Sequence, residues 1–345
     1  FYDFLNTKDA LYATYTITAG GKVIAEGEVP TLDIAPHAEA EVALGYTMPE
    51  QSKAMLNITY YQKEAAGLTP AGFVLGFDQL QLTEAGPAAL SEIKGCECIR
   101  VEESLREIVV SGADFRYAFD TFTGQLKEMT KNGKPMIDRP VDVAIWRAPT
   151  DNDRRVRFEW ERAGFDRPVV RVYEMTAALE DGKAVVTAHL SLAPIYLQKI
   201  LDLTMVYTIG AGGLMDIAVS GTKEMEMPFL PRLGLRFFLP KTMDQAKYLG
   251  YGPDESYIDK HHGSAYGLYA TTAKANHEDY IKPQENGSHW GCDCASVSDA
   301  AGKGFCFTAA NPFSFNVSPY TAEELTAKKH NFEIEECPST VVSVD

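Results

Sequence analysis

The chain has 345 residues, enough for two or three domains, and carries a formal net charge of −16. Hydrophobic residues make up 45% of the chain and charged residues 23%, as in ordinary globular proteins. The acidic balance argues against a nucleic-acid partner, because the chain has no basic stripe to displace counterions from phosphates; it favours a neutral substrate. No apolar run approaches the roughly 18 residues of a membrane helix, so we expect no membrane partner either.

Apolar and β-branched residues alternate with period two along most of the chain, which is typical of half-buried strands. The clearest runs are ALYATYTITA (10–19), KAMLNITYYQK (53–63), REIVVSG (106–112), FRYAFD (115–120), KAVVTAHLSLA (183–193), LDLTMVYTIG (201–210), LMDIAVSG (214–221), LGLRFFLP (233–240) and GKGFCFTAA (302–310). Glycine-rich turns separate them. Helical signal is confined to 158–165 and to 321–329, where Thr321 and Glu324 form a capping box. The sequence therefore predicts an all-β fold.

Three segments follow from this pattern. Residues 1–82 have the strand spacing of a small antiparallel sandwich. Residues 83–104 are rich in Ala, Gly and Glu without periodicity and are expected to be a linker. Residues 105–345 form a second, larger β block. Strands and helices never alternate, which excludes a TIM barrel for this sequence. Both ends look cut, so we expect a fragment of a longer chain, with the large domain truncated at its C-terminal end.

The six cysteines are too sparse for a disulfide scaffold. They are Cys96, Cys98, Cys292, Cys294, Cys306 and Cys337. A zinc site from Cys292, Cys294 and His289 is conceivable, but the C-x-C spacing is shorter than the usual C-x₂₋₄-C of zinc ligands. We expect buried free thiols and no metal site.

Several stretches, taken in order, resemble the C-terminal part of glycoside hydrolase family 2 β-galactosidases. The first two, in the smaller block, are GGKVIAEGEVPTLDIAPHAEAEVAL (20–44) and GFDQLQL (76–82). The others, in the larger block, are FDTFTGQLKEMTKNGKPMI (119–137), WRAPTDND (146–153), YLGYGPDESYIDK (248–260), YIKPQENGSHWGC (280–292) and FSFNVSPYTAEELTAKKH (313–330). Each match is weak alone, but their order and separation span the whole chain.

The resemblance implies an Ig-like domain at 1–82 and, at 105–345, the small-chain domain with a fold like that of galactose mutarotase, a supersandwich. It implies a parent β-galactosidase that hydrolyses terminal β-galactosides with retention. Two glutamates of an upstream TIM barrel, outside this sequence, would do the chemistry. We therefore expect no catalytic residues and no cofactor here, with any Mg or Na of the parent enzyme bound in that barrel. The expected partners are carbohydrate and the chain's own catalytic domain, in a full-length homo-oligomer.

The sequence also departs from the family pattern in three places. Lys260 replaces the family's Arg, and the loop after Asp153 is short. The chain stops at Asp345, before the tryptophan that helps line the galactose pocket in many members. Because the catalytic barrel is absent, the fragment alone is expected to be inactive.

The segment RAPTDND offers the main substrate-binding candidates, which are Arg147, Asp151, Asn152 and Asp153. As a structural turn, it would use Pro149 to fix φ and Arg147 to pin the loop by an ion pair with Asp151 or Asp153. As a functional loop, its polar groups would bind sugar hydroxyls or shape the mouth of the barrel. The structural interpretation is favoured, and the resemblance keeps the functional one open.

Three other features carry weaker signals. In GPDESYIDK, alternating Glu255, Tyr257 and Asp259 would share one face of a strand, as acid and base or, preferably, as anchors for a loop. The histidines at 261, 262 and 277 are expected in solvated loops. Trp290, in the turn-rich ENGSHWGCD, is expected on a polar loop, where it would stack on a sugar face or join the core.

Two functions from different classes remain. The first is the non-catalytic C-terminal portion of a β-galactosidase, which supports the barrel and helps to complete the active-site rim. The alternative is a free-standing carbohydrate-binding or mutarotase-like β-sandwich protein. A mutarotase would need a histidine and a glutamate placed for acid/base exchange at the sugar, and no H-x-x-N pattern at a strand end supplies them.

Overall fold

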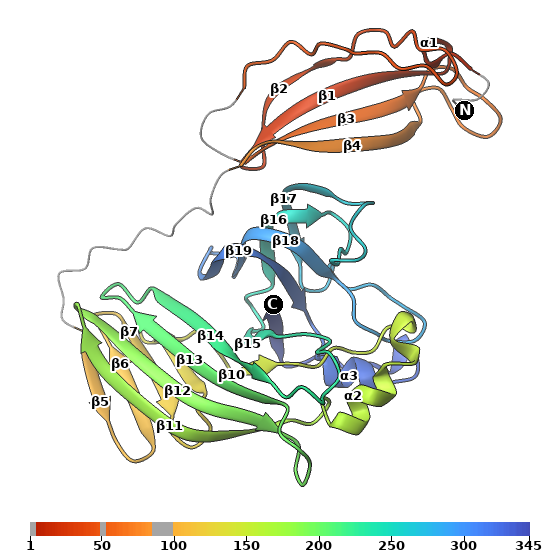
Figure 1. Ribbon diagram of the computed structural model, residues 1–345. Coiled ribbons are helices and arrows are strands. Elements are labelled where there is room, and N and C mark those ends of the chain that lie inside the picture. Colours follow the sequence, from red (N-terminus) through yellow and green to blue (C-terminus); the bar gives the residue numbers. More distant parts are fainter. Residues whose placement is uncertain (1–4, 49–52, 85–98) are drawn as a thin grey trace.

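The structure, a computed structural model, describes residues 5–48, 53–84 and 99–345. The described residues form four antiparallel sheets with a few short helices, so the predicted all-β fold is confirmed (Figure 1). No helix in these ranges is both long and apolar enough to cross a membrane.

The first sheet, in the N-terminal part of the chain, has the order β2-β1-β3-β4. Its strands are β1 (Leu11–Ala19), β2 (Lys22–Glu28), β3 (Ala54–Gln62) and β4 (Val74–Thr83), preceded by the single-turn helix α1 (Thr7–Ala10). Tyr15, Ile17 and Leu56 form its core, against which Leu44 and Tyr46 of the extended segment 29–48 pack. Within the described residues, this unit is a four-stranded sheet covered by one extended segment.

The larger part of the chain contains the other three sheets. A five-stranded sheet comprises β5 (Arg100–Glu103), β6 (Glu107–Ser111), β7 (Phe115–Asp120), β8 (Leu126–Lys131) and β9 (Lys134–Pro135). A four-stranded sheet comprises β11 (Val169–Glu180), β12 (Lys183–Ala193), β13 (Leu201–Ile209) and β14 (Met215–Lys223). A seven-stranded sheet has the order β10-β15-β20-β19-β18-β16-β17.

The strands of the seven-stranded sheet are β10 (Arg139–Ala144), β15 (Gly234–Pro240), β16 (Gln245–Gly252), β17 (Ala265–Thr272), β18 (Ser288–Ser298), β19 (Gly304–Ser318) and β20 (Ser339–Val344). One hydrophobic core runs through all three sheets, and alternate residues of β12 and β13 point into it, as period-two patterning requires. Trp160 of helix α2 (Arg157–Ala163) is fully buried in the same core.

Element boundaries agree with the sequence where patterning was strong. Strand β12 spans the predicted 183–193. Thr321 caps helix α3 (Ala322–Ala327) by accepting a hydrogen bond from Glu324 N at 3.2 Å, as predicted, but the helix ends two residues before the predicted 329. Helix α2 is shorter than the predicted 158–165, because Gly164 adopts a left-handed conformation and ends it.

The start of the large domain differs from the expected boundary. Strand β5 lies inside the segment predicted as a linker and pairs with β6, so the sheet is already formed at Arg100. Residues 85–98, the rest of that segment up to Ile99, lie outside the described residues, as do Cys96 and Cys98.

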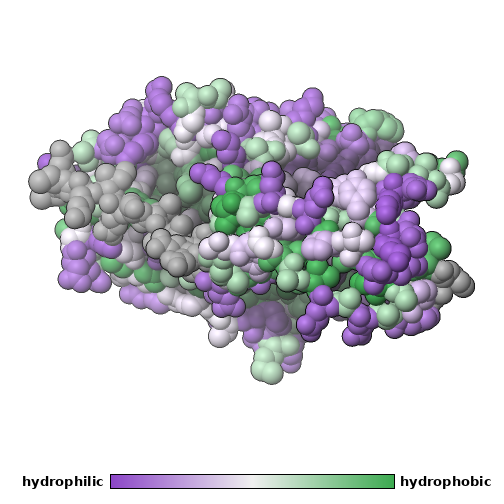
Figure 2. All heavy atoms as spheres, turned by 90° about the horizontal axis from the view of Figure 1, so that it is seen from above, coloured by the Kyte–Doolittle hydropathy of each residue, from purple (hydrophilic) through white to green (hydrophobic). Residues whose placement is uncertain are grey.

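The N-terminal sheet lies over the β16–β17 end of the seven-stranded sheet (Figure 1). Seen from above, polar side chains cover most of the face, and apolar side chains are exposed in a hollow near its middle (Figure 2). The two parts are in direct contact, since Lys53 forms an ion pair with Asp293 at 3.1 Å.

Candidate functional site

The RAPTDND loop follows strand β10 and is closed by an internal ion pair. The guanidinium of Arg147 binds both carboxylate oxygens of Asp153, with Nε–Oδ2 at 3.1 Å and NH2–Oδ1 at 2.7 Å. Asp153 also accepts hydrogen bonds from the backbone N–H of Thr150 at 2.9 Å and from its hydroxyl at 3.1 Å. The Asp153 side chain is only 7% exposed. The predicted ion pair is therefore present with Asp153, whose buried carboxylate is bound within the loop.

The same loop turns its other two polar candidates outward. Asp151 and Asn152 are exposed in the single 3₁₀ turn η1 (Asp151–Arg154). The backbone N–H of Asp151 donates to Gln284 Oε1 at 2.8 Å, which ties the loop to the segment PQENG. Of the four candidates in RAPTDND, Asp151 and Asn152 are exposed, Arg147 is partly exposed and Asp153 is buried.

Directly beneath the loop lies a buried charged cluster. Glu285 N donates to Ala148 O at 3.0 Å, and the Glu285 carboxylate pairs with Arg232 at 2.8 Å. Arg232 Nε also binds Asp345 at 2.7 Å. Burial alone would lower the pKa of Arg232, but the carboxylates of Asp345 and Glu285 raise it. Burial raises the pKa of Asp345, against the opposing effect of Arg232.

The turn GPDESYIDK is anchored beside this cluster through Glu255. Its carboxylate accepts hydrogen bonds from Lys260 at 2.7 Å, Gly287 N at 3.1 Å and the hydroxyls of Tyr257 and Tyr280. Burial alone would raise the pKa of Glu255, but these hydrogen bonds outweigh it and lower the pKa. An ionised carboxylate with four donors is an anchor rather than a proton donor, as the sequence favoured.

The expected strand face in GPDESYIDK is not formed. Residues 253–260 make a turn closed by an isolated bridge between Tyr257 and Lys260, and Asp259 is exposed. The Gly252-Pro253 step ends strand β16 there, so Glu255 and Asp259 do not form a carboxylate pair.

Trp290 lies in strand β18 and not on a loop, which corrects the expectation from the sequence. Its ring stacks on His261, with centroids 4.1 Å apart and planes at 29°, and lies 5.1 Å from the ring of Tyr251. His262 stacks on His261 in turn, at 4.7 Å. Trp290 is half-buried, so the aromatic cluster Tyr251–His261–His262–Trp290 presents part of its apolar surface to solvent.

The structure thus brings three predicted motifs together and leaves one candidate apart. The RAPTDND loop, the PQENG segment and the GPDESYIDK turn meet around Glu285 and Glu255. Trp290 belongs instead to the aromatic cluster. This cluster is connected to the junction along the chain and through Ser256, whose hydroxyl accepts a hydrogen bond from Trp290 N at 2.9 Å. Sequence reasoning missed Arg232, whose only signal was a charge inside the otherwise apolar stretch PFLPRLGL.

Two expectations about single residue types also need correction. The side chain of His277 is only 6% exposed and packs on Tyr320, and His261 is half-buried; only His262 is exposed as expected. Among the described cysteines, Cys292 and Cys337 are buried free thiols, whereas Cys294 is half-buried and Cys306 is exposed. Within the described residues, no three His, Cys, Asp or Glu side chains are placed to hold a metal ion.

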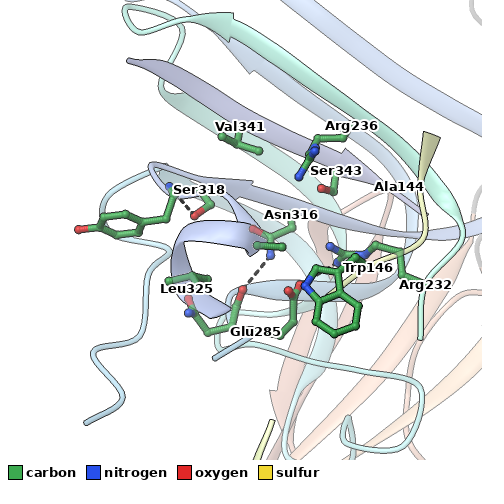
Figure 3. A pocket seen from close by; sticks show the side chains of 13 residues that line it. Ala144, Trp146, Arg232, Arg236, Glu285, Asn316, Ser318, Leu325, Val341 and Ser343 are labelled. Carbon is green, nitrogen blue, oxygen red and sulfur yellow. Dashed lines mark hydrogen bonds and ion pairs between the residues drawn. The ribbon is translucent and has the colours of Figure 1, made fainter. Parts of the chain in front are cut away.

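One small cavity lies at the junction, and none of the junction residues lines the larger cleft. A polar cavity of about 30 Å³ lies between the seven-stranded sheet and α3, with Arg232, Glu285, Asn316 and Trp146 on its walls (Figure 3). It can hold one or two waters, far less than the roughly 300–1,000 Å³ of small-molecule sites. A second cleft of about 400 Å³, within that range, is lined by Asp142 and Arg236, which pair with each other at 3.0 Å, and by none of the predicted site residues.

A buried histidine next to the aromatic cluster supplies a pH-dependent prediction. His289 is buried, stacks on Tyr248 at 3.9 Å and bonds Asn276 Oδ1 at 2.7 Å. Burial lowers its pKa to about 4. His289 therefore takes up a proton near pH 6.5 in the unfolded chain but only near pH 4 in the folded chain. Above pH 6.5, His289 is neutral in both states and does not reduce the free energy of unfolding. Between pH 6.5 and 4 we expect this group to lower the free energy of unfolding by about 3 kcal/mol.

The measurement is urea unfolding of the chain and of His289→Gln between pH 7 and 4.5. The variant is expected to be less stable at pH 7, because it loses the stacking contact, and to lose less on acidification. Parallel curves for the two proteins would show that His289 titrates normally in the folded state.

The comparisons with known proteins cover both parts of the chain. The family model "Beta galactosidase small chain" matches residues 111–345, and the model "Beta-galactosidase, domain 4" matches residues 1–83. The chain belongs to the β-galactosidase small chain family.

Curated relatives of this small chain family match along nearly the whole sequence. The β-galactosidase of Actinobacillus pleuropneumoniae is 37% identical over 100% of this chain, and that of Staphylococcus xylosus is 28% identical over 99%. In both cases the match covers 34% of the relative, so the chain spans about a third of their length. Among solved structures, a putative mutarotase from Salmonella typhimurium aligns over 75% of this chain and 88% of its own, with a TM-score of 0.34 and 10% identity.

Proposed function

We propose that this chain is the non-catalytic C-terminal portion of a glycoside hydrolase family 2 β-galactosidase that removes terminal β-D-galactosyl residues with retention. The observation that carries the proposal is that domain 4 and the small chain match in order along one sequence. The carboxylate pair that such hydrolysis needs would lie in the upstream barrel of the parent enzyme. The chain alone would therefore have no activity, and neither a cofactor nor a metal is required of it.

The role of the small chain in this proposal is to support the barrel and to help complete the rim of its active site. The Arg147–Asp153 pair holds the loop in one conformation, and Asp151 and Asn152 extend from it as exposed hydrogen-bonding groups. The half-buried ring of Trp290 offers a second contact for carbohydrate, through stacking. Carbohydrate, the catalytic domain and further copies of the full-length chain are the partners proposed.

The rim proposal predicts a kinetic effect without a stability effect. In the parent enzyme, the double variant Asp151→Ala/Asn152→Ala should lower kcat/KM for a β-galactoside by about fivefold to thirtyfold, since two hydrogen bonds of about 0.5–1 kcal/mol each are lost. Its melting temperature should stay unchanged, because both side chains are exposed. Asp216→Ala, an exposed acid on β14, is the matched control.

Steady-state kinetics and thermal melting of the same preparations decide the matter. Unchanged kinetics in the double variant would remove these two residues from the rim. Turnover of a β-galactoside by the isolated chain, free of host enzyme, would contradict the assignment of the chemistry to the barrel.

The alternative of a free-standing sugar-binding or mutarotase-like protein draws no support from the predicted site residues, none of which lines the cleft of about 400 Å³. The polar face of the seven-stranded sheet is covered by α3 and leaves only about 30 Å³. His289 is buried, so it cannot reach a sugar hydroxyl.

A further inference from the structure

The two parts of the chain meet at a joint with several independent contacts. On the N-terminal side it consists of Gly21, Lys53 and Gln79, and on the other side of Leu268, Tyr266 and Asp293. Strands β17 and β18 of the seven-stranded sheet supply the second set. In Figure 1 this joint lies where β1–β4 approach β17.

Gln79 binds the edge strand β17 as a neighbouring strand would. Its side-chain Nε2 donates to Tyr266 O at 2.8 Å, and its Oε1 accepts from Tyr266 N at 2.7 Å. Both backbone groups of Tyr266 are therefore satisfied by one amide. A two-bond contact of this kind fixes both the position and the orientation of β17.

Lys53 adds a charged contact at the same tyrosine. Its ammonium lies 3.1 Å from Asp293 Oδ2 and 4.0 Å from the centroid of the Tyr266 ring. The Tyr266 hydroxyl donates to the same carboxylate oxygen of Asp293. The side chains of Lys53 and Asp293 are 18% and 19% exposed, so this ion pair is shielded from solvent more than a surface pair.

Gly21 brings the β1–β2 turn into close contact with the large domain. A Cβ added at Gly21 would lie 2.3 Å from Leu268 Cβ, so only glycine fits there. The neighbouring Gly20 also has a positive φ, but a Cβ there would meet nothing within 4 Å. The two glycines differ in their contact with the large domain and share the same backbone requirement.

The joint continues directly into the aromatic cluster. Tyr266 is paired with Tyr251 in the β16–β17 ladder, and their rings are 5.9 Å apart in an edge arrangement. Tyr251 then contacts the Trp290 ring at 5.1 Å and rests against Gly291, where a Cβ would come within 3.0 Å of its ring. Asp293 stands on the same strand as Trp290, three residues further on.

We propose that Lys53 and Gln79 are positioning residues, through which the N-terminal sheet fixes the orientation of Trp290 and its aromatic cluster by way of Tyr266 and Tyr251. The first sheet then has a role beyond connecting the small chain domain to the rest of the protein. That the cluster binds a β-galactoside rests on the proposed function. That Lys53 and Gln79 position the cluster rests only on the contacts of the joint.

The chain's three tryptophans make the test specific. Trp146 and Trp160 are buried in the core of the large domain, and only Trp290 belongs to the cluster. Labelling with 5-fluorotryptophan gives one fluorine resonance for each, and Trp→Phe variants assign them. The Trp146 and Trp160 resonances are internal references for the fold of the large domain.

We expect Lys53→Met/Gln79→Ala to shift and broaden the Trp290 resonance and to leave the other two in place. Broadening is expected because a released cluster samples several orientations on the microsecond to millisecond timescale. Lys53→Arg alone, which keeps both the cation and the native Gln79, should retain a single sharp Trp290 resonance. Lys8→Met, which breaks an exposed ion pair with Asp33 in the same sheet unit, is the matched control and should change nothing.

The glycine pair gives a second route that does not depend on the charged contact. Gly21→Ala should move the Trp290 resonance, whereas Gly20→Ala carries the same backbone cost without the clash and should not. This pair keeps the test open if the double variant fails to fold. An unmoved Trp290 resonance in Gly21→Ala, or equal shifts of all three resonances, would overturn the proposal.

Kinetics in the parent enzyme separate this inference from the proposed function. If both hold, the joint variants also change KM for a β-galactoside. A shifted Trp290 resonance with unchanged kinetics would support the positioning by Lys53 and Gln79 but show that Trp290 does not contact the substrate.

Discussion

Arg232→Met is expected to cause the largest loss of stability of any single substitution discussed for this chain. Arg232 is the cation between Glu285 and Asp345, at 2.8 and 2.7 Å, and its side chain is only 10% exposed. Removing one partner of a buried ion pair costs about 3–5 kcal/mol, because the remaining charge is desolvated without compensation. Here two carboxylates are left, so we expect the upper end, about 5 kcal/mol.

The pH dependence of the variant gives this prediction a second signature. Without Arg232, burial raises the pKa of Asp345 further, because the opposing effect of the guanidinium is gone. Asp345 in the folded variant then binds protons more readily than in the unfolded chain, so the stability of the variant relative to the unaltered chain should increase as the pH falls from 7 towards 5. Urea unfolding at several pH values measures this.

A compensating substitution provides the control for Arg232. In Arg232→Met/Glu285→Gln a neutral amide replaces one of the two carboxylates, so part of the lost stability should return at pH 7. Full stability of Arg232→Met alone at pH 7 would show that water reaches the cluster and that the charges are not buried.

Arg147→Ala is expected to cost about 3 kcal/mol, the lower end of the range for a buried pair, since Arg147 is 27% exposed and Asp153 only 7%. The substitution leaves the Asp153 carboxylate with only the two hydrogen bonds from Thr150. It also removes the guanidinium from the Trp160 ring, 5.7 Å away. Thermal or denaturant unfolding measures the loss.

Arg167→Ala is the matched control for Arg147. Arg167 also binds a carboxylate at 2.7 Å, that of Asp166, but its side chain is 55% exposed, so its loss should cost about 0–1 kcal/mol. Equal costs for the two substitutions would mean that the RAPTDND ion pair is an ordinary surface pair. In the parent enzyme, a change in kcat/KM of Arg147→Ala at a temperature where the variant is folded would show that the loop also contributes to the active-site rim.

The sequence predicted the parts of the fold where the pattern is local. Strands with strict alternation, such as β12 and β13, and the cap at Thr321 follow from neighbouring residues alone. Strand β5 escaped prediction because four residues rich in charge form a strand only when β6 is available as a partner.

The candidate site was predictable only in part, for the same reason. The pair of Arg147 with Asp153 lies within one loop, and the sequence named it as one of two choices. Arg232, by contrast, meets its partners 53 and 113 positions away along the chain, and no local pattern announces that meeting. Trp290 was expected on a loop because Gly287 and Gly291 flank it, although both glycines adopt positive φ inside or beside a bulged strand.

The Gln79–Tyr266 contact has a consequence for the solubility of the chain. Strand β17 is the last strand of the seven-stranded sheet, and an open strand edge can recruit a strand from another molecule. At Tyr266 the outward backbone N–H and C=O are both occupied by one side-chain amide, and the N-terminal sheet stands in front of them. The N-terminal sheet therefore protects the large domain against edge-to-edge aggregation at this point.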